Sequence, residues 1–145
     1  MRKKIEGTSG VRRWSVRHLQ ALQIQKMYAG GEVKGRGAVT GRVTQYQKPG
    51  QLDNLGIERV LVYAGKTLRP HRHHKTEAFL IITAGRGTIV LNGTAVPVRK
   101  GDVVSIPPRT VHGFTTRKHQ LEFIAIQRPG VYQPGKREDL EVVAE

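Results

Sequence analysis

Histidine and carboxylate side chains occur in two stretches of the sequence at a spacing that suits one metal ion. His71 and His73 are followed by Glu77, and a third histidine, His112, comes later in the chain. Because side chains alternate faces along a strand, a His-x-His pair on an extended segment puts both imidazoles on the same face. These ligand types prefer Mn, Fe, Ni, Zn or Cu to Ca or Mg. We therefore predict one divalent transition metal, of undetermined identity, held by His71, His73, Glu77 and His112.

Four further residues are candidates for binding a substrate beside that metal. Arg69 has the same strand parity as the first two histidines, and a buried arginine is costly unless it meets an anion. Arg109 is either a second anion clamp or a solvated loop residue. Phe79 and Phe114 either line the substrate pocket or pack in the core. These residue types predict a small anionic substrate.

Length and composition limit the class of protein. A chain of 145 residues suits one domain with a core of its own. Cysteine is absent, which excludes disulfides and thiolate chemistry. No apolar run approaches the roughly 18 residues of a membrane span, and the first residues lack the apolar region of a signal peptide. We expect a cytoplasmic protein with no membrane partner.

The formal net charge of +14 is high and unevenly distributed. Residues 1–50 carry eleven Lys and Arg against two acids, and residues 51–145 carry fourteen against nine. A basic balance favours anionic partners, whether a phosphorylated small molecule, nucleic acid or an acidic protein surface. Charge alone does not choose among them.

The sequence divides into three parts. Residues 1–50 form a basic N-terminal extension, in which Ser15 and Gly30-Gly31 bracket one short helix over residues 16–28. Within the same extension, the alternation over residues 32–46 predicts two short strands. Residues 51–135 form an all-β barrel, and residues 136–145 are a polar tail.

The barrel is predicted from short apolar runs separated by turn residues. Asn92-Gly93 between two alternating runs is a strong signal for a two-residue hairpin. Many short strands with evenly spaced turns are typical of a sandwich or a barrel. We expect strands at residues 57–63, 67–73, 78–83, 87–91, 94–98, 103–106, 112–116 and 121–127.

Residues 52–128 resemble the cupins, a superfamily of small jelly-roll barrels. The resemblance rests on a two-part motif with a His-x-His and a glutamate in the first part and a histidine in the second. It implies a jelly-roll fold, an open metal centre and commonly a homodimer. The matching residues are Gly65, His71, His73, Glu77, Gly101, Pro107 and His112.

Two departures from the motif concern the site directly. Arg109 stands where the second part usually has glycine, and seven residues rather than six separate Glu77 from Gly85. Counted back from Gly85, the ligand position falls on Ala78, and a slip of one residue turns a strand side chain to the other face. A β-bulge within residues 78–84 would keep Glu77 inward. We favour that bulge, with a three-histidine centre as the alternative.

Two functions of different classes follow. The first is a metal-dependent enzyme with isomerase-like or dioxygenase-like chemistry on a sugar-phosphate-like or oxygenated substrate. The chain is similar to small cupins related to the C-terminal domain of bifunctional mannose-phosphate isomerases, although Gly113 replaces the arginine that follows their last histidine ligand. The second is a non-catalytic binding or assembly module whose basic extension docks on nucleic acid or an acidic partner.

Overall fold

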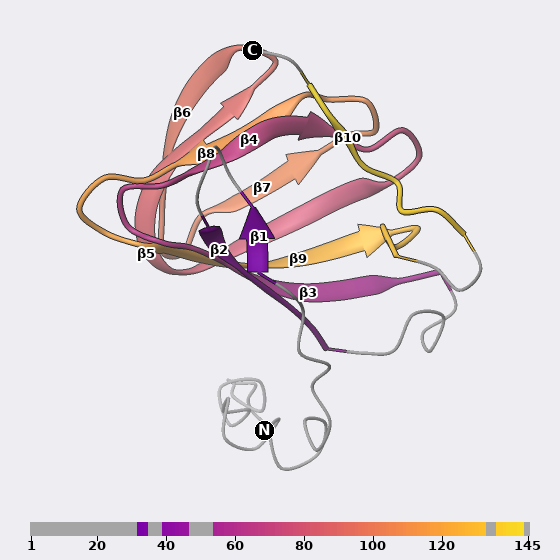
Figure 1. Ribbon diagram of the computed structural model, residues 1–145, viewed down its shortest axis with the longest axis horizontal. Helices are drawn as coiled ribbons and strands as arrows, with labels where there is room; N and C mark the ends of the chain where they lie inside the picture. Colours follow the sequence, from indigo (N-terminus) through magenta and orange to yellow (C-terminus); the bar gives the residue numbers. More distant parts are fainter. Residues whose placement is uncertain (1–31, 35–38, 47–53, 133–135, 144–145) are drawn as a thin grey trace, which may run out of the picture.

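The structure is a computed structural model that describes residues 32–34, 39–46, 54–132 and 136–143. Within these residues the chain is all-β (Figure 1). The predicted helix at residues 16–28 lies outside the described residues. In the part of the chain that the structure describes, no helix is long and apolar enough to cross a membrane.

The described strands are numbered in chain order. They are β1 (Glu32–Lys34), β2 (Val39–Gln45), β3 (Gly56–Val62), β4 (Thr67–Arg72), β5 (Glu77–Leu91), β6 (Thr94–Arg99), β7 (Val103–Ile106), β8 (His112–Thr115), β9 (Leu121–Arg128) and β10 (Glu141–Val142).

One long strand, β5, joins two layers into a barrel (Figure 1). Its first part, as far as Gly85, pairs with β9 and β7, and its second part, from Arg86, pairs with β6 and β8. One layer therefore contains β1, β2, β3, β9 and β7, and the other contains β10, β4, β8 and β6. All pairs are antiparallel.

Gly85 marks the point where β5 passes between the layers. Its φ of 73° is one that side chains rarely adopt. A Cβ at this position would lie 1.8 Å from the Gln120 carbonyl oxygen of the neighbouring chain segment. Glycine is therefore required for β5 to remain one continuous strand across the bend.

The core fills the space between the layers with residues from alternating positions. On β5, Leu80 and Ile82 are buried while Phe79 is exposed, and on β9 the same alternation buries Phe123. The rings of Phe114 and Phe123 stack with centroids 4.7 Å apart. This apolar packing supports the strands that carry the histidines.

Most predicted strands are confirmed to within one or two residues. The exception is the pair expected at residues 78–83 and 87–91, which are parts of the single strand β5. The hairpin at Asn92-Gly93 is confirmed, with φ of 46° and 85° at the two positions. A register shift between Ile82 and Ala84 puts a bulge within the predicted segment.

The segment predicted as a polar tail is part of the barrel. Glu141 and Val142 form β10, which pairs with Arg72 and His71 of β4. Farther back, Asp139 contacts the turn after β4. This strand was not predicted from the sequence, because two residues are too few to show an alternation of apolar and polar side chains.

Candidate metal centre

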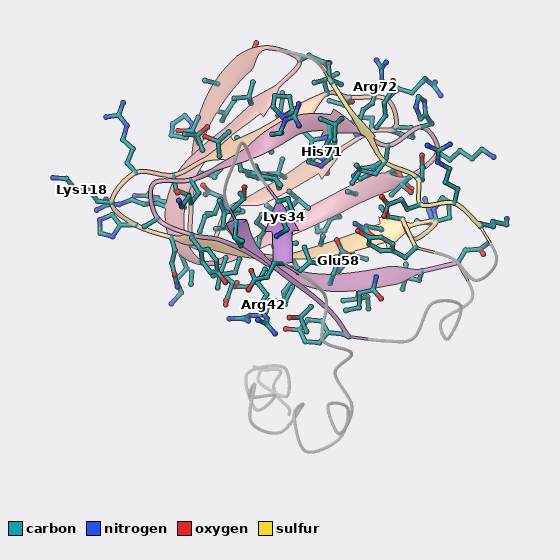
Figure 2. The ribbon with its side chains drawn as sticks, in the orientation of Figure 1. Lys34, Arg42, Glu58, His71, Arg72 and Lys118 are labelled. Atoms are coloured by element: carbon teal, nitrogen blue, oxygen red, sulfur yellow. The ribbon has the colours of Figure 1, made fainter. Side chains whose placement is uncertain are left out.

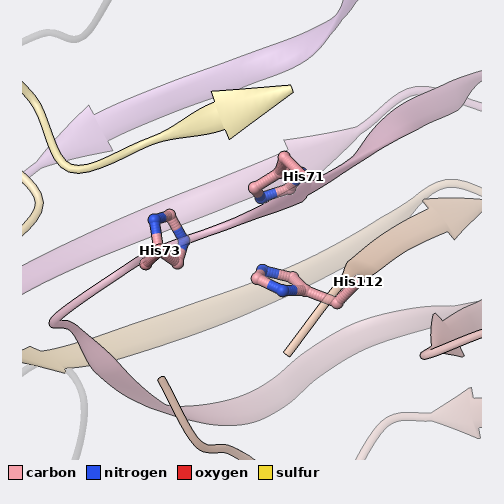
Figure 3. Close-up of side chains that lie close together, drawn as sticks. All are labelled: His71, His73 and His112. Carbon is pink, nitrogen blue, oxygen red and sulfur yellow. The ribbon is translucent and has the colours of Figure 1, made fainter. Parts of the chain in front are cut away.

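Three buried histidines lie close together in the barrel (Figure 3). His71 lies on β4 opposite His112 on β8, and His73 follows directly after β4. The ring centroids of His71 and His112 are 4.3 Å apart, and that of His73 is 5.4 Å and 5.2 Å from the other two. Each histidine offers one ring nitrogen to a group whose members all lie within 4.8 Å of one another. The predicted convergence of these three residues is confirmed.

Backbone carbonyls fix the orientation of all three rings. Nδ1 of His71 lies 2.8 Å from the Arg69 carbonyl oxygen, and Nδ1 of His112 lies 2.9 Å from that of Thr110. Nδ1 of His73 lies 2.5 Å from the carbonyl oxygen of Asp139. A carbonyl oxygen can only accept, so each Nδ1 carries the proton and donates it. Each Nε2 is then left with a free lone pair, which is the tautomer that binds a metal.

Burial keeps these imidazoles neutral. Burial lowers the pKa of His71 to about 4. The hydrogen bond to the Arg69 carbonyl raises this pKa in part, and the nearby His73 lowers it further. Burial, with the nearby His71, lowers the pKa of His112 to about 3. Burial also lowers the pKa of His73. Neutral imidazoles need no deprotonation before they bind a cation.

Glu77 is not part of this group, which corrects the prediction of a fourth ligand. Its side chain is 48% exposed and forms an ion pair with Arg128, whose Nε lies 3.0 Å from Glu77 Oε1. The buried neighbour is Ala78, which lines the histidine cavity. The bulge is present, but it lies between Ile82 and Ala84 and does not turn Glu77 inward. The described residues thus support the three-histidine alternative.

Arg69 lies where the sequence predicted, in the wall of the cavity that contains the histidines. Its Nε is buried and has no hydrogen-bond partner among the described residues. A buried donor without a partner is costly. The guanidinium is therefore a ready site for an anionic group within the cavity.

Arg109 does not line the cavity, contrary to its prediction as a second clamp. It lies in the turn before β8 with a φ of 64°, and its side chain is exposed. The positive φ explains why the motif usually has glycine at this position. The Arg109 backbone amide donates to the His73 carbonyl oxygen at 2.7 Å. Its contribution is thus to hold the backbone of a ligand residue.

The two phenylalanines have different positions. Phe114 is buried and lines the cavity, and its ring lies edge-on to His112 with centroids 6.5 Å apart. Phe79 is 43% exposed on the outer face of β5, where it borders a separate surface hollow. Its prediction as a substrate-lining residue is wrong, because the same parity that turns Glu77 outward also turns Phe79 outward.

Sequence reasoning missed a buried glutamate in the same cavity. Glu58 on β3 is 8% exposed and accepts a hydrogen bond from the Gln127 amide at 3.2 Å. Burial raises the pKa of Glu58 to about 7, partly offset by that hydrogen bond. The inward alternation of β3 was the only available signal. The cavity has a volume of about 200 Å³, and its polar lining beyond the histidines consists of Lys34, Glu58, Arg69, Gln127 and Tyr132.

Asp139 was also missed, although it supports the centre in two ways. Its carbonyl oxygen accepts from His73, and its carboxylate accepts from the backbone amides of His74, Lys75 and Thr76 at 2.7–3.0 Å. Burial tends to raise the pKa of this carboxyl, but the amide hydrogen bonds outweigh it and the pKa is lowered. No motif in the sequence joins Asp139 to His73, since the contact depends on the fold.

Comparison with known proteins identifies the class. Residues 59–126 match the family model described as a cupin domain. A structure from Klebsiella pneumoniae described as having a double-stranded beta-helix domain aligns with a TM-score of 0.60, at 14% identity over 72% of this chain and 85% of that chain. Residues 59–126 thus correspond to a cupin domain.

Other similar proteins share the fold at low identity. Pac13 from Streptomyces, described as a nucleoside dehydratase, aligns with a TM-score of 0.61 at 21% identity, over 83% of this chain and 87% of that chain. KdgF from Halomonas aligns with a TM-score of 0.58 at 18% identity, over 70% and 88% of the two chains. A predicted oxalate decarboxylase from Thermotoga maritima aligns with a TM-score of 0.57 at 20% identity, over 61% and 80%.

One curated relative matches in sequence. An uncharacterized protein of Methanocaldococcus jannaschii is 38% identical over 55 residues, which cover 38% of this chain and 43% of that protein. The chain thus spans less than half the length of this relative.

Proposed function

We propose that the protein is a metal-dependent cupin enzyme that acts on a small anionic, oxygenated molecule. The observation that carries this proposal is the arrangement of three neutral, backbone-fixed imidazoles in a cavity that is also lined by Arg69, whose buried Nε has no hydrogen-bond partner among the described residues. The donor set fits a first-row divalent ion, because three imidazoles each offer a ring nitrogen within 4.8 Å of the others beside the cavity.

The residues of the cavity define what the site could do. His71, His73 and His112 would hold the metal, which when bound supplies Lewis-acid polarisation of a substrate oxygen. Arg69 would bind and orient an anionic group of the substrate. Glu58, with a pKa of about 7, can hold or release a proton at the cavity wall near neutral pH. The chemistry that suits this set is proton transfer at a carbon next to an oxygen function of the substrate, as in isomerisation, with dioxygenase-like chemistry as the alternative.

The size of the cavity and the names of the similar proteins support a small substrate. A volume of about 200 Å³ suits a molecule smaller than a typical drug-sized ligand, whose sites are about 300–1,000 Å³. A nucleoside dehydratase and a predicted oxalate decarboxylase share the fold, and both names refer to small oxygenated molecules. The resemblance to mannose-phosphate isomerases stays a prediction and favours a sugar-phosphate-like substrate.

Metal content tests the proposal most directly. Purified protein reconstituted with Mn, Fe, Ni, Zn or Cu should retain about one ion per chain after desalting. The double variant His71→Ala/His112→Ala should retain none, while the exposed His119→Ala should behave as wild type. Metal analysis by mass spectrometry measures the ratio. Equal retention by the double variant would show that the histidines are not the ligands.

The role of Arg69 in anion binding is tested with a separate variant. Arg69→Gln should keep the metal and lose binding of small phosphorylated sugars and carboxylates by about tenfold or more. Arg109→Gln removes the same charge outside the cavity and is the matched control. If both variants bind these anions as wild type does, Arg69 is not the clamp.

A further inference from the structure

A second hollow lies at another end of the barrel and is larger than the histidine cavity. It has a volume of about 680 Å³ and is bordered by β5, β6 and the turn between β8 and β9. It shares no lining residue with the histidine cavity. Lys118, at its rim, projects from the side of the barrel away from Arg72 (Figure 2). The two sites are therefore separate.

The lining of this hollow, which we call the basic groove, is cationic. Arg86, Arg99, Arg117 and Lys118 line it, and Asp102 is its one acid. Asp102 is already engaged, because Oδ2 accepts from the Arg99 backbone amide at 2.8 Å. With four cations and one acid, the groove has an excess of positive charge.

These cations lack the acidic partners that other arginines of the barrel have. Each of Arg42, Arg59, Arg72 and Arg128 forms an ion pair with a glutamate. Among the described residues, none of the four groove cations does so. Arg86 Nη2 does contact another groove residue, at 2.8 Å from Nε2 of His119, but this bond brings no negative charge. An unpaired group of cations around a hollow is an arrangement that attracts an anion.

The chemistry of the groove favours a ligand with several phosphate oxygens and an apolar part. Guanidinium groups bind phosphate oxygens in a bidentate manner, and four cations exceed what one carboxylate needs. The groove also includes the exposed Pro97, which offers an apolar surface, and the hydroxyl residues Thr88 and Thr115. Its volume falls in the range of about 300–1,000 Å³ that is usual for small-molecule sites.

We propose that the basic groove binds a nucleoside di- or triphosphate, with the phosphates against its arginines and Lys118 and the base against Pro97. This site is independent of the metal centre and does not rest on the function proposed for that centre.

Calorimetric titration with ADP tests the proposal on the full chain at about 150 mM salt, where unspecific surface attraction is screened. Wild type should bind ADP, pyrophosphate should bind more weakly, and adenosine should not bind. Arg99→Gln/Lys118→Gln should weaken ADP binding about tenfold or more, since each change removes a charge-assisted contact. Lys136→Gln/Arg137→Gln removes two exposed charges that line neither site and should bind as wild type does.

A third variant separates the groove from the metal centre. His71→Ala/His112→Ala should bind ADP with unchanged affinity, which would show that the nucleotide is not held by a metal at the histidines. The proposal is overturned if ADP fails to bind, if the Lys136/Arg137 control loses as much affinity as the groove variant, or if only the histidine variant loses it. Tighter binding of a DNA duplex than of ADP through the groove residues would also overturn it and would assign the groove to nucleic acid.

Discussion

At the scale of single residues, the feature that defines the site is the fixed tautomer of each histidine. Carbonyl oxygens of Arg69, Thr110 and Asp139 accept from Nδ1, so Nε2 faces the cavity. The motif in the sequence predicted which histidines meet, because a two-residue spacing puts side chains on one face. The hydrogen-bond partners could not be predicted, since backbone carbonyls are present at every residue and only the fold selects one.

Glu58 leads to a prediction on stability. Its pKa is raised to about 7 in the folded protein from an ordinary value of 4.5, so the folded state keeps a proton that the unfolded state has released. The contribution of this retained proton to the free energy of unfolding is therefore complete below about pH 4.5. It is lost as pH rises through 7, which lowers the free energy of unfolding by up to about 3 kcal/mol. Glu58→Gln, which cannot ionise, should be more stable than wild type by about 1–3 kcal/mol at about pH 8 and similar to it near pH 5.

Urea unfolding of the metal-free protein at both pH values measures this difference. Glu138→Gln is the control, because Glu138 is exposed and its removal should not alter the pH dependence. If Glu58→Gln loses stability between the two pH values as wild type does, another group is responsible.

At the scale of elements, the segment after β9 completes the metal centre. Asp139 bonds the three amides that follow His73 and also orients the His73 ring, while β10 pairs with β4 beside His71. Strands β3 to β9 were predictable from alternation and from turn residues such as Asn92-Gly93, except that β5 was expected as two strands. Glu77 was wrongly predicted to point inward. The spacing between Glu77 and Gly85 showed that β5 must absorb one extra residue, but it did not show at which position.

The second prediction concerns Asp139. Asp139→Ala removes the carboxylate that accepts from three backbone amides and so loosens the backbone carbonyl of residue 139, which orients the His73 ring. Metal affinity should therefore fall about 10–100-fold, although all three histidine ligands remain. Asp139→Asn keeps one side-chain oxygen as an acceptor and should lose less. Competition with a metal chelator, at a temperature where all variants are folded, measures the affinity.

Glu138→Ala changes the exposed neighbour and serves as the control. Wild-type metal affinity in folded Asp139→Ala would show that Asp139 has a structural role without influence on the centre.

At the scale of the whole molecule, charge is the dominant feature. The formal net charge is +14, and residues 1–50, most of which lie outside the described part, carry eleven basic residues against two acids. Composition predicted anionic partners but not where on the surface they would bind. The basic groove depends on residues from three separate segments, which only the barrel brings together.

The third prediction concerns the non-catalytic alternative, in which the extension docks on nucleic acid. Deletion of residues 1–14 removes five basic residues and one acid, so affinity for a generic DNA duplex at low salt should fall and depend less steeply on salt concentration. Fluorescence anisotropy over a range of salt concentrations measures both quantities. Absence of duplex binding at low salt, or no change on deletion, would remove nucleic-acid docking as a role for this arm.

The continuity of β5 has a consequence for how the barrel comes apart. The layer that contains the groove's Arg86 and the layer that contains the inner wall of the histidine cavity are hydrogen-bonded to the same fifteen-residue strand. Opening either layer at β5, so that its amide hydrogens exchange with solvent, therefore disturbs the pairing of the other layer. The amide hydrogens of β5 should consequently exchange together, in the slowest class, as one cooperative unit rather than as two independent sheets.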